Sequence, residues 1–89
     1  NIKLQLLDHH GSGQNCANKY DWYYLDTTRS ATKITYEYFQ DNYNEFNNLC
    51  EKDFDLLIEA VNAVDIWLED NKYFEFGKVC MTMVSKAYE

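Results

Sequence analysis

The feature that most constrains this chain is residues 6–13, LLDHHGSG, where an apolar run stops at a carboxylate and two imidazoles. Apolar and polar side chains alternate over residues 2–6, which is the period of a β-strand. Asp8, His9 and His10 are therefore expected at the carboxyl end of a strand, where open α/β sheets bind ligands. The two glycines that follow predict a turn whose backbone comes close to a ligand.

Length and composition predict a single globular unit over residues 1–89. The 89 residues are 46% hydrophobic and 17% aromatic, which is too apolar for a disordered segment. No apolar run is long enough to cross a bilayer, and no signal-peptide pattern opens the chain. We therefore expect no membrane partner.

Net charge and cysteine content limit the classes of function and the cell compartment that we expect. A net charge of −7 without a basic cluster argues against binding to duplex DNA. It still permits a small anionic substrate, because a bound divalent metal reverses the field around a few carboxylates. Cys16, Cys50 and Cys80 are odd in number and form no Cys-x-x-Cys pair, which indicates reduced thiols in a cytoplasmic protein.

Periodicity divides the rest of the chain. Residues 14–19 are polar and predict a surface loop, and the aromatic run over residues 20–25 predicts a second strand. A loop or short helical turn is expected at 41–48, and Asp53 is expected to cap the helix that follows it. Helices are predicted at about 31–40, from Phe54 to about Leu68, and over 73–88.

The final helix carries apolar residues at helical spacing, which predicts a buried face. Met81 and Met83 are interpreted as core residues, and Gly77 as a site of close approach between helices.

Ser30 precedes the helix that starts near Ala31, and its side chain has two readings. In the first, Ser30 caps the helix. Alternatively, the helix N-terminus with Ser30 helps to hold a substrate phosphate.

Asp65 falls on the apolar stripe of the central helix, four residues after Val61 and three before Leu68. A buried charge without a partner costs several kcal/mol, so this carboxylate needs a cation, a metal or backbone donors. Two structural readings remain open: Asp65 caps a neighbouring loop, or the helix ends near Asp65 and turns it outward. The upstream Asp-His-His shifts our interpretation towards a metal ligand.

Asp8-His9-His10 with its glycine turn resembles the signature of the DHH phosphoesterases. These are metal-dependent hydrolases of phosphodiester and phosphoanhydride bonds, such as RecJ-type exonucleases, nano-RNases and cyclic dinucleotide phosphodiesterases. The resemblance extends through residues 20–22, residues 30–32 and residues 62–67 in the family's order. It implies an α/β fold: a partial Rossmann-like domain, with short strands at the N-terminus followed by about three helices.

The resemblance also implies a role for each site residue. His9 and Asp65 would bind the same metal ion, His10 would face a phosphate oxygen, and Asp8 would orient an imidazole. The cofactor implied is Mn²⁺ or Mg²⁺, two ions in the full-length parent protein. The substrate would be a small phosphorylated molecule or a short oligonucleotide.

General chemistry agrees with these roles. Two metal ions about 3.5–4 Å apart lower the pKa of a shared water and clamp the phosphate. Carboxylates and imidazoles suit Mn²⁺ or Mg²⁺. Side chains of neighbouring residues on an extended strand point to opposite faces, so only one of the two histidines is expected to bind metal.

One departure from the family pattern is clear. The family's earlier His-x-x-x-Asp-x-Asp motif does not occur in this chain. We therefore expect a piece of a larger protein, the second half of a catalytic domain, that is inactive by itself. A homodimer through surface exposed by truncation is a further expectation.

Two alternative functions remain open at this stage. One is a non-catalytic acidic interaction domain, in which His9 and Asp65 would lie far apart or would each be satisfied by local hydrogen bonds. The other is an isolated fragment that binds phosphate at His10 and the helix beginning near Ser30.

Overall fold

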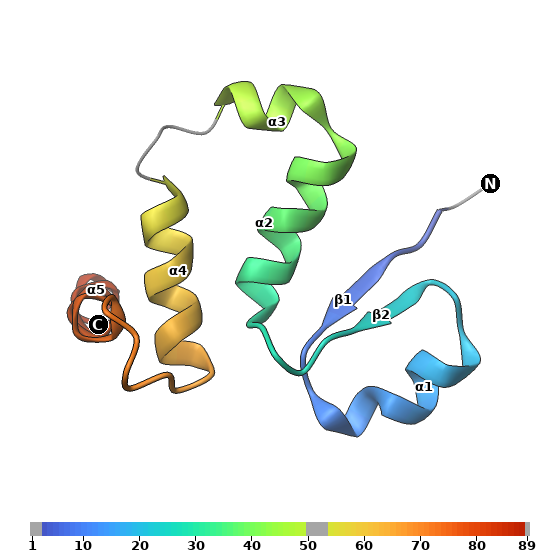
Figure 1. The fold of residues 1–89 in the computed structure, drawn as a ribbon, viewed down its shortest axis with the longest axis horizontal. Coiled ribbons are helices and arrows are strands. Elements are labelled where there is room, and N and C mark those ends of the chain that lie inside the picture. Colours follow the sequence, from blue (N-terminus) through green and yellow to red (C-terminus); the bar gives the residue numbers. More distant parts are fainter. Residues whose placement is uncertain (1–2, 50–53, 89) are drawn as a thin grey trace.

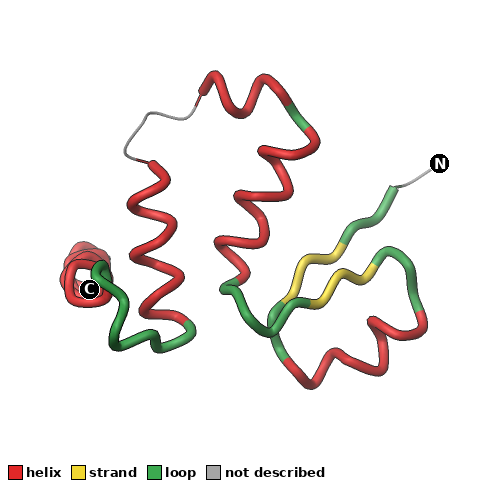
Figure 2. The backbone as a smooth tube through the Cα atoms, viewed as in Figure 1, coloured by secondary structure: helices red, strands yellow, loops and turns green. Residues whose placement is uncertain are grey.

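The structure is a computed structural model that describes residues 3–49 and 54–88, and the expected cap at Asp53 lies outside these ranges. The described residues form a mixed α/β fold that is mostly helical, as Figure 2 shows. The α/β class is confirmed, but more helices form than the three that the sequence predicted. In chain order the elements are β1 (Leu6–Asp8), the 3₁₀ helix η1 (Gly11–Gly13), α1 (Gln14–Lys19), β2 (Tyr23–Leu25), α2 (Ala31–Asn42), α3 (Asn44–Leu49), α4 (Phe54–Asp65) and α5 (Phe74–Ala87).

The two strands pair in parallel. Leu6 lies opposite Tyr23, and Asp8 lies opposite Leu25. One further bond follows β2, because the Asp26 amide donates to the carbonyl of Asp8, the last residue of β1, at 3.0 Å. Both strands therefore end at the same edge of the sheet, and this edge carries Asp8.

The prediction of a loop at residues 14–19 is wrong, because this segment is the helix α1. The Gln14 side-chain amide donates to Asn18 Oδ1 at 2.8 Å, a contact one helical turn apart. The Tyr20 amide closes the helix by donating to the Cys16 carbonyl at 2.9 Å. A polar segment can thus be helical when its own side chains support the turn.

Helix α2 lies between the sheet and the C-terminal helices (Figure 1). Its Ile34 is 2% exposed and anchors the core. From α4, Ile58, Ala60 and Ala63 face this core, and Phe74 from α5 is also buried. This arrangement brings the C-terminal end of α4 to the level of the strand ends.

Helix α4 ends at Asp65, three residues before the predicted end at Leu68. The Leu68 amide donates to the Ala63 carbonyl at 2.7 Å, and the Trp67 amide donates to the Val64 carbonyl at 3.2 Å. These two bonds form a Schellman motif, with Trp67 in the left-handed region at φ 57°. Glycine usually occupies this position and marks the end of a helix in a sequence. Because Trp67 stands there instead, the apolar pattern continued past the true end and the predicted end was too late.

Helices α4 and α5 approach closely at Gly77, as the sequence predicted. A Cβ at Gly77 would lie 2.4 Å from the Ala60 carbonyl oxygen. Beyond this contact α5 is largely open: Met83 is 65% exposed and Val84 is 57% exposed. The interpretation of Met81 and Met83 as core residues is therefore wrong, because only the first turns of α5 pack on α4.

Within the described ranges, no helix combines the length and apolar character needed to cross a membrane.

Candidate functional site

The carboxyl end of β1 and the carboxyl end of α4 meet, and this brings His9 and Asp65 together. His9 Nε2 lies 3.7 Å from Asp65 Oδ2. The His9 side chain is 17% exposed and the Asp65 side chain 46%. The two groups that the family resemblance assigned to one metal ion are therefore neighbours in space. A non-catalytic interaction domain would not need this proximity.

Asp65 reaches this position because α4 ends there. The reading in which the helix ends near Asp65 and turns it outward is confirmed, and the expectation of a buried Asp65 that needs a partner is wrong. The Schellman motif turns the chain, and the carboxylate is half exposed. Asp65 therefore lies near His9 because of where α4 ends. The cost of burying an unpaired charge does not explain this proximity.

The donor chemistry of this pair fits a divalent metal. An Mg²⁺ ion lies about 2.0–2.1 Å from each oxygen ligand, and imidazole and carboxylate both suit Mn²⁺. Two atoms 3.7 Å apart can share such an ion, because the two bond lengths together exceed their separation. Among residues 3–49 and 54–88, however, no group of three His, Cys, Asp or Glu side chains could hold a metal. The pair would therefore supply only part of a coordination sphere.

Asp8 organises the strand end by accepting four hydrogen bonds. Its Oδ1 accepts from the His9 amide at 2.8 Å, the His10 amide at 3.3 Å and His10 Nδ1 at 2.6 Å. Its Oδ2 accepts from the Tyr23 hydroxyl at 2.5 Å. Asp8 therefore holds the imidazole of His10.

These bonds shift the pKa values of both acids. The Tyr23 hydroxyl, and after it His10, hold the pKa of Asp8 well below its usual range. The same bond raises the pKa of Tyr23 to about 12. At neutral pH, Asp8 is thus a carboxylate and Tyr23 a protonated donor.

We expect the stabilisation from Asp8 to depend on pH. An unfolded Asp has a pKa of about 3.9, and the folded value is lower, so the contribution is complete above about pH 4. It is lost as the pH falls through the folded pKa. Urea unfolding should show a stability gap between the unmodified chain and Asp8→Asn that is constant from pH 7 to about pH 5 and shrinks below about pH 4. A gap independent of pH would contradict this.

The two imidazoles lie together, which corrects the expectation that they point to opposite faces. The ring centroids of His9 and His10 are 4.3 Å apart. Strand pairing has ended at Asp8, and the bond from the His10 amide to Asp8 Oδ1 turns the chain there. His10 is consequently open to solvent, with a side chain 69% exposed.

The glycines also differ from expectation. Neither Gly11 nor Gly13 has a positive φ, and both belong to the 3₁₀ helix η1. A Cβ at Gly11 would meet nothing within 4 Å, whereas one at Gly13 would lie 2.1 Å from the Tyr23 hydroxyl oxygen. Gly13 is therefore required for space and not for a turn.

Ser30 caps α2, which confirms the capping interpretation. Its Oγ accepts from the Lys33 amide at 3.1 Å, and its own amide donates to Asn62 Oδ1 at 2.7 Å. Ser30 is 0% exposed and Asn62 is 4% exposed. The Ser30 side chain thus has no surface to offer a ligand, and its phosphate-binding role remains a prediction for the helix terminus.

Sequence reasoning missed Asn62, although a polar residue on the buried side of α4 was a usable signal. We expect Asn62→Ala to destabilise the fold by about 1–3 kcal/mol, because the buried Ser30 amide loses its acceptor. Thermal unfolding followed by circular dichroism measures this. Asn15→Ala, at an exposed position of α1, should change stability by less than about 0.5 kcal/mol. Equal effects of the two changes would contradict the prediction.

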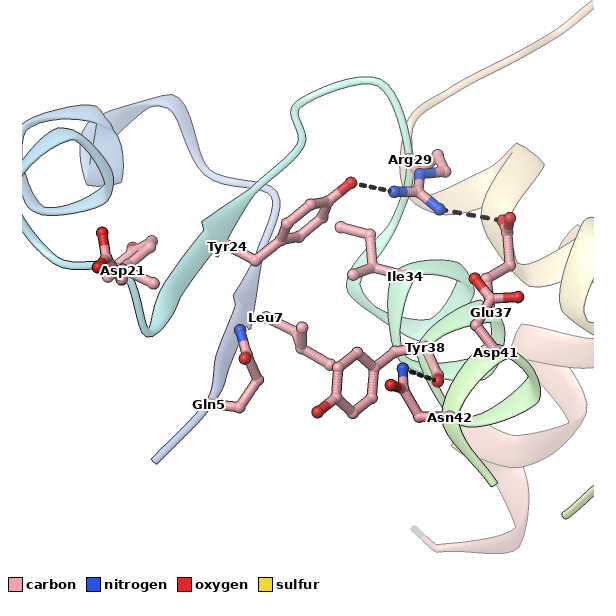
Figure 3. Close-up of a pocket in the computed structure, with 11 residues that line it drawn as sticks. Gln5, Leu7, Asp21, Tyr24, Arg29, Ile34, Glu37, Tyr38, Asp41 and Asn42 are labelled. Carbon is pink, nitrogen blue, oxygen red and sulfur yellow. Dashed lines mark hydrogen bonds and ion pairs between the residues drawn. The ribbon is translucent and has the colours of Figure 1, made fainter. Parts of the chain in front are cut away.

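A separate pocket of about 340 Å³ lies between β2 and α2 (Figure 3). The guanidinium of Arg29, which lines this pocket, already has partners. It donates to the Tyr24 hydroxyl at 2.6 Å. It also lies 3.2 Å from the Glu37 carboxylate and 2.7 Å from the Asp26 carboxylate. None of the predicted site residues lines this pocket. It therefore offers no free cation for an anionic substrate.

Comparison with known proteins points to the phosphodiesterases as the class of enzyme that this chain resembles. No protein-family model matches the chain. It is 45% identical, over all 89 of its residues, to a 3',5'-cyclic-nucleotide phosphodiesterase of Helicobacter pylori (strain ATCC 700392 / 26695). The chain spans 26% of that relative's length.

A solved structure shares the fold. The crystal structure of an uncharacterized protein from Helicobacter pylori G27 superposes with a TM-score of 0.82 at 48% identity. The match covers 96% of this chain and 24% of that one. The arrangement that brings β1 to the end of α4 is therefore found in a longer protein.

Proposed function

We propose that this chain is part of a metal-dependent phosphoesterase of the DHH type. Its substrates are phosphodiester or phosphoanhydride bonds in short oligonucleotides, cyclic dinucleotides or related nucleotides. The observation that carries the proposal is the 3.7 Å distance between His9 Nε2 and Asp65 Oδ2. The name of the similar Helicobacter pylori protein supports the same class of substrate.

Each site residue has one task in this proposal. His9 and Asp65 hold one Mn²⁺ or Mg²⁺ ion. The bound metal supplies charge neutralisation and a water of lowered pKa. His10 is exposed and faces a phosphate oxygen, while Asp8 fixes the His10 ring through Nδ1.

The chain by itself is proposed to be inactive or only weakly active. Two ligands cannot complete two metal sites, and the described residues contain no group of three His, Cys, Asp or Glu side chains that could hold a metal. The missing ligands come from other parts of a longer polypeptide, in line with the quarter of the relative that the chain spans. We place that protein in the cytoplasm, which the free thiols of Cys16 and Cys80 support.

Hydrolysis assays with Mn²⁺ test the proposal. A longer polypeptide that includes an upstream His-x-x-x-Asp-x-Asp motif should cleave a 3',5'-cyclic nucleotide or a dinucleotide, and the 89-residue chain should not. His9→Ala or Asp65→Ala in the longer protein should abolish turnover, whereas Asp70→Ala, in an exposed turn, should not. An inert longer polypeptide would contradict the proposal.

We also propose that the 89-residue chain self-associates through α5. Its surface of 7028 Å² exceeds the roughly 5,500 Å² of a compact monomer of this mass. Its radius of gyration is 14.9 Å against about 12 Å for a compact chain of this length. The excess surface of one chain is about twice the roughly 800 Å² that each partner buries in a standard protein interface.

Sedimentation tests this association. The chain should form a dimer whose Kd rises at least about tenfold on Met83→Glu, because a charge then enters the apolar surface of α5. The control Thr27→Glu, in an exposed turn, should leave Kd unchanged. A monomer at all concentrations would contradict this proposal.

A further inference from the structure

The two oxygens of Asp8 are held very differently. Oδ1 accepts three hydrogen bonds, all from the two residues that follow it in the chain. In the described part of the chain, Oδ2 accepts from the Tyr23 hydroxyl alone, at 2.5 Å. The bonds from His9 and His10 all meet at Oδ1, so they leave the position of Oδ2 undetermined. Tyr23, which reaches Oδ2 from the neighbouring strand, therefore fixes the plane of the carboxylate.

The Tyr23 hydroxyl in turn occupies a confined space. It lies against the backbone of Gly13, where a Cβ would be 2.1 Å from the hydroxyl oxygen and 3.0 Å from Asp8 Oδ2. Gly13 has φ −83°, which any residue can adopt, so only the space explains a glycine there. The phenol is thus confined between β1 and the start of α1.

We propose that Tyr23 is a positioning residue that acts through Asp8 on His10. Gly13, which has no Cβ, leaves the space that the Tyr23 hydroxyl occupies. Tyr23 fixes the plane of the Asp8 carboxylate, and Oδ1 is thereby held 2.6 Å from His10 Nδ1. This inference rests on the proposed function only where it assigns His10 to a phosphate.

The arrangement determines which nitrogen of His10 is available. A carboxylate can only accept, so His10 Nδ1 carries the hydrogen of this bond and Nε2 is left to face a ligand. Tyr23 can keep this geometry at neutral pH, because a tyrosine hydroxyl is protonated there and remains a donor, and the bond to Asp8 raises the pKa of Tyr23 further, to about 12. Without Tyr23 only the bonds to Oδ1 hold the carboxylate, so its plane is less fixed and the Nδ1–H form of His10 is less strongly favoured.

The tautomer of His10 can be read at one fixed pH. Nitrogen-15 NMR of the histidine-labelled 89-residue chain at pH 7.5 reports which ring nitrogen carries the hydrogen. We expect the Nδ1–H form in the unmodified chain, and a shift towards the Nε2–H form of free imidazole in Tyr23→Phe and Gly13→Ala. The matched controls are Tyr24→Phe on the same strand, whose hydroxyl faces Arg29, and Gly11→Ala, whose Cβ meets nothing within 4 Å. Neither control should change the signal.

A second titration separates this inference from the proposed function. Inorganic phosphate added to the same samples should move the His10 signals, with affinity about tenfold weaker in Tyr23→Phe. An Nδ1–H signal that is unchanged in Tyr23→Phe would overturn the inference, even if phosphate binds. A Tyr23-dependent tautomer without any phosphate binding would uphold the positioning role and count against the assignment of His10 to a phosphate.

Discussion

Gly77→Ala is expected to destabilise the chain by about 3 kcal/mol, although alanine is the better helix former. In an exposed helix this change would stabilise by about 1 kcal/mol. Here the new Cβ would lie 2.4 Å from the Ala60 carbonyl oxygen and 2.6 Å from Val64 Cγ2. A backbone carbonyl inside α4 cannot move aside, so α5 must shift away and uncover Phe74.

Urea unfolding followed by circular dichroism measures this effect, with Gly11→Ala as the control. A Cβ at Gly11 meets nothing within 4 Å, so its replacement should change stability by less than about 0.5 kcal/mol. A gain of stability in Gly77→Ala would mean that α4 and α5 do not pack as described.

His9→Ala and Asp65→Ala should each weaken Mn²⁺ binding by about 100-fold or more. Loss of even an indirect support of a metal ligand commonly costs 10–100-fold, and each of these changes would remove one of the two proposed direct ligands, whose atoms lie 3.7 Å apart. Free Mn²⁺ measured by electron spin resonance during titration gives the affinity.

Asp70→Ala is the control for this titration, because it removes the same charge from an exposed turn. With a net charge of −7 the chain attracts cations in general, and Asp70→Ala reports that background. If Asp70→Ala weakens binding as much as Asp65→Ala does, the paired site is wrong.

Much of this framework followed from local sequence patterns. The stop of the apolar run at Asp8 predicted the end of β1, and the position of Ser30 predicted the start of α2. A single glycine within the helical pattern of residues 73–88 predicted the close approach at Gly77. These features depend on a few neighbouring residues, so periodicity and capping rules reach them.

Features that depend on contacts between distant segments were not predictable. The bond from Tyr23 to Asp8 joins two strands, and the bond from Ser30 to Asn62 joins two helices. No short pattern marks either pair. Trp67 misled in another way, because a bulky residue occupies the left-handed position that normally identifies a helix end by its glycine.

The burial of α5 was overestimated for a related reason. Apolar spacing shows which face of a helix could be covered, but it does not show whether a partner is present. Val79 and Met83 satisfy the helical pattern and are nevertheless 57% and 65% exposed.

We propose that one ion bridges the end of β1 and the end of α4. Anomalous diffraction at the manganese edge, from crystals of the chain soaked in Mn²⁺, tests this site directly. We expect one peak within about 2.2 Å of both His9 Nε2 and Asp65 Oδ2. A peak bound by only one of these atoms, or by other carboxylates, would contradict it.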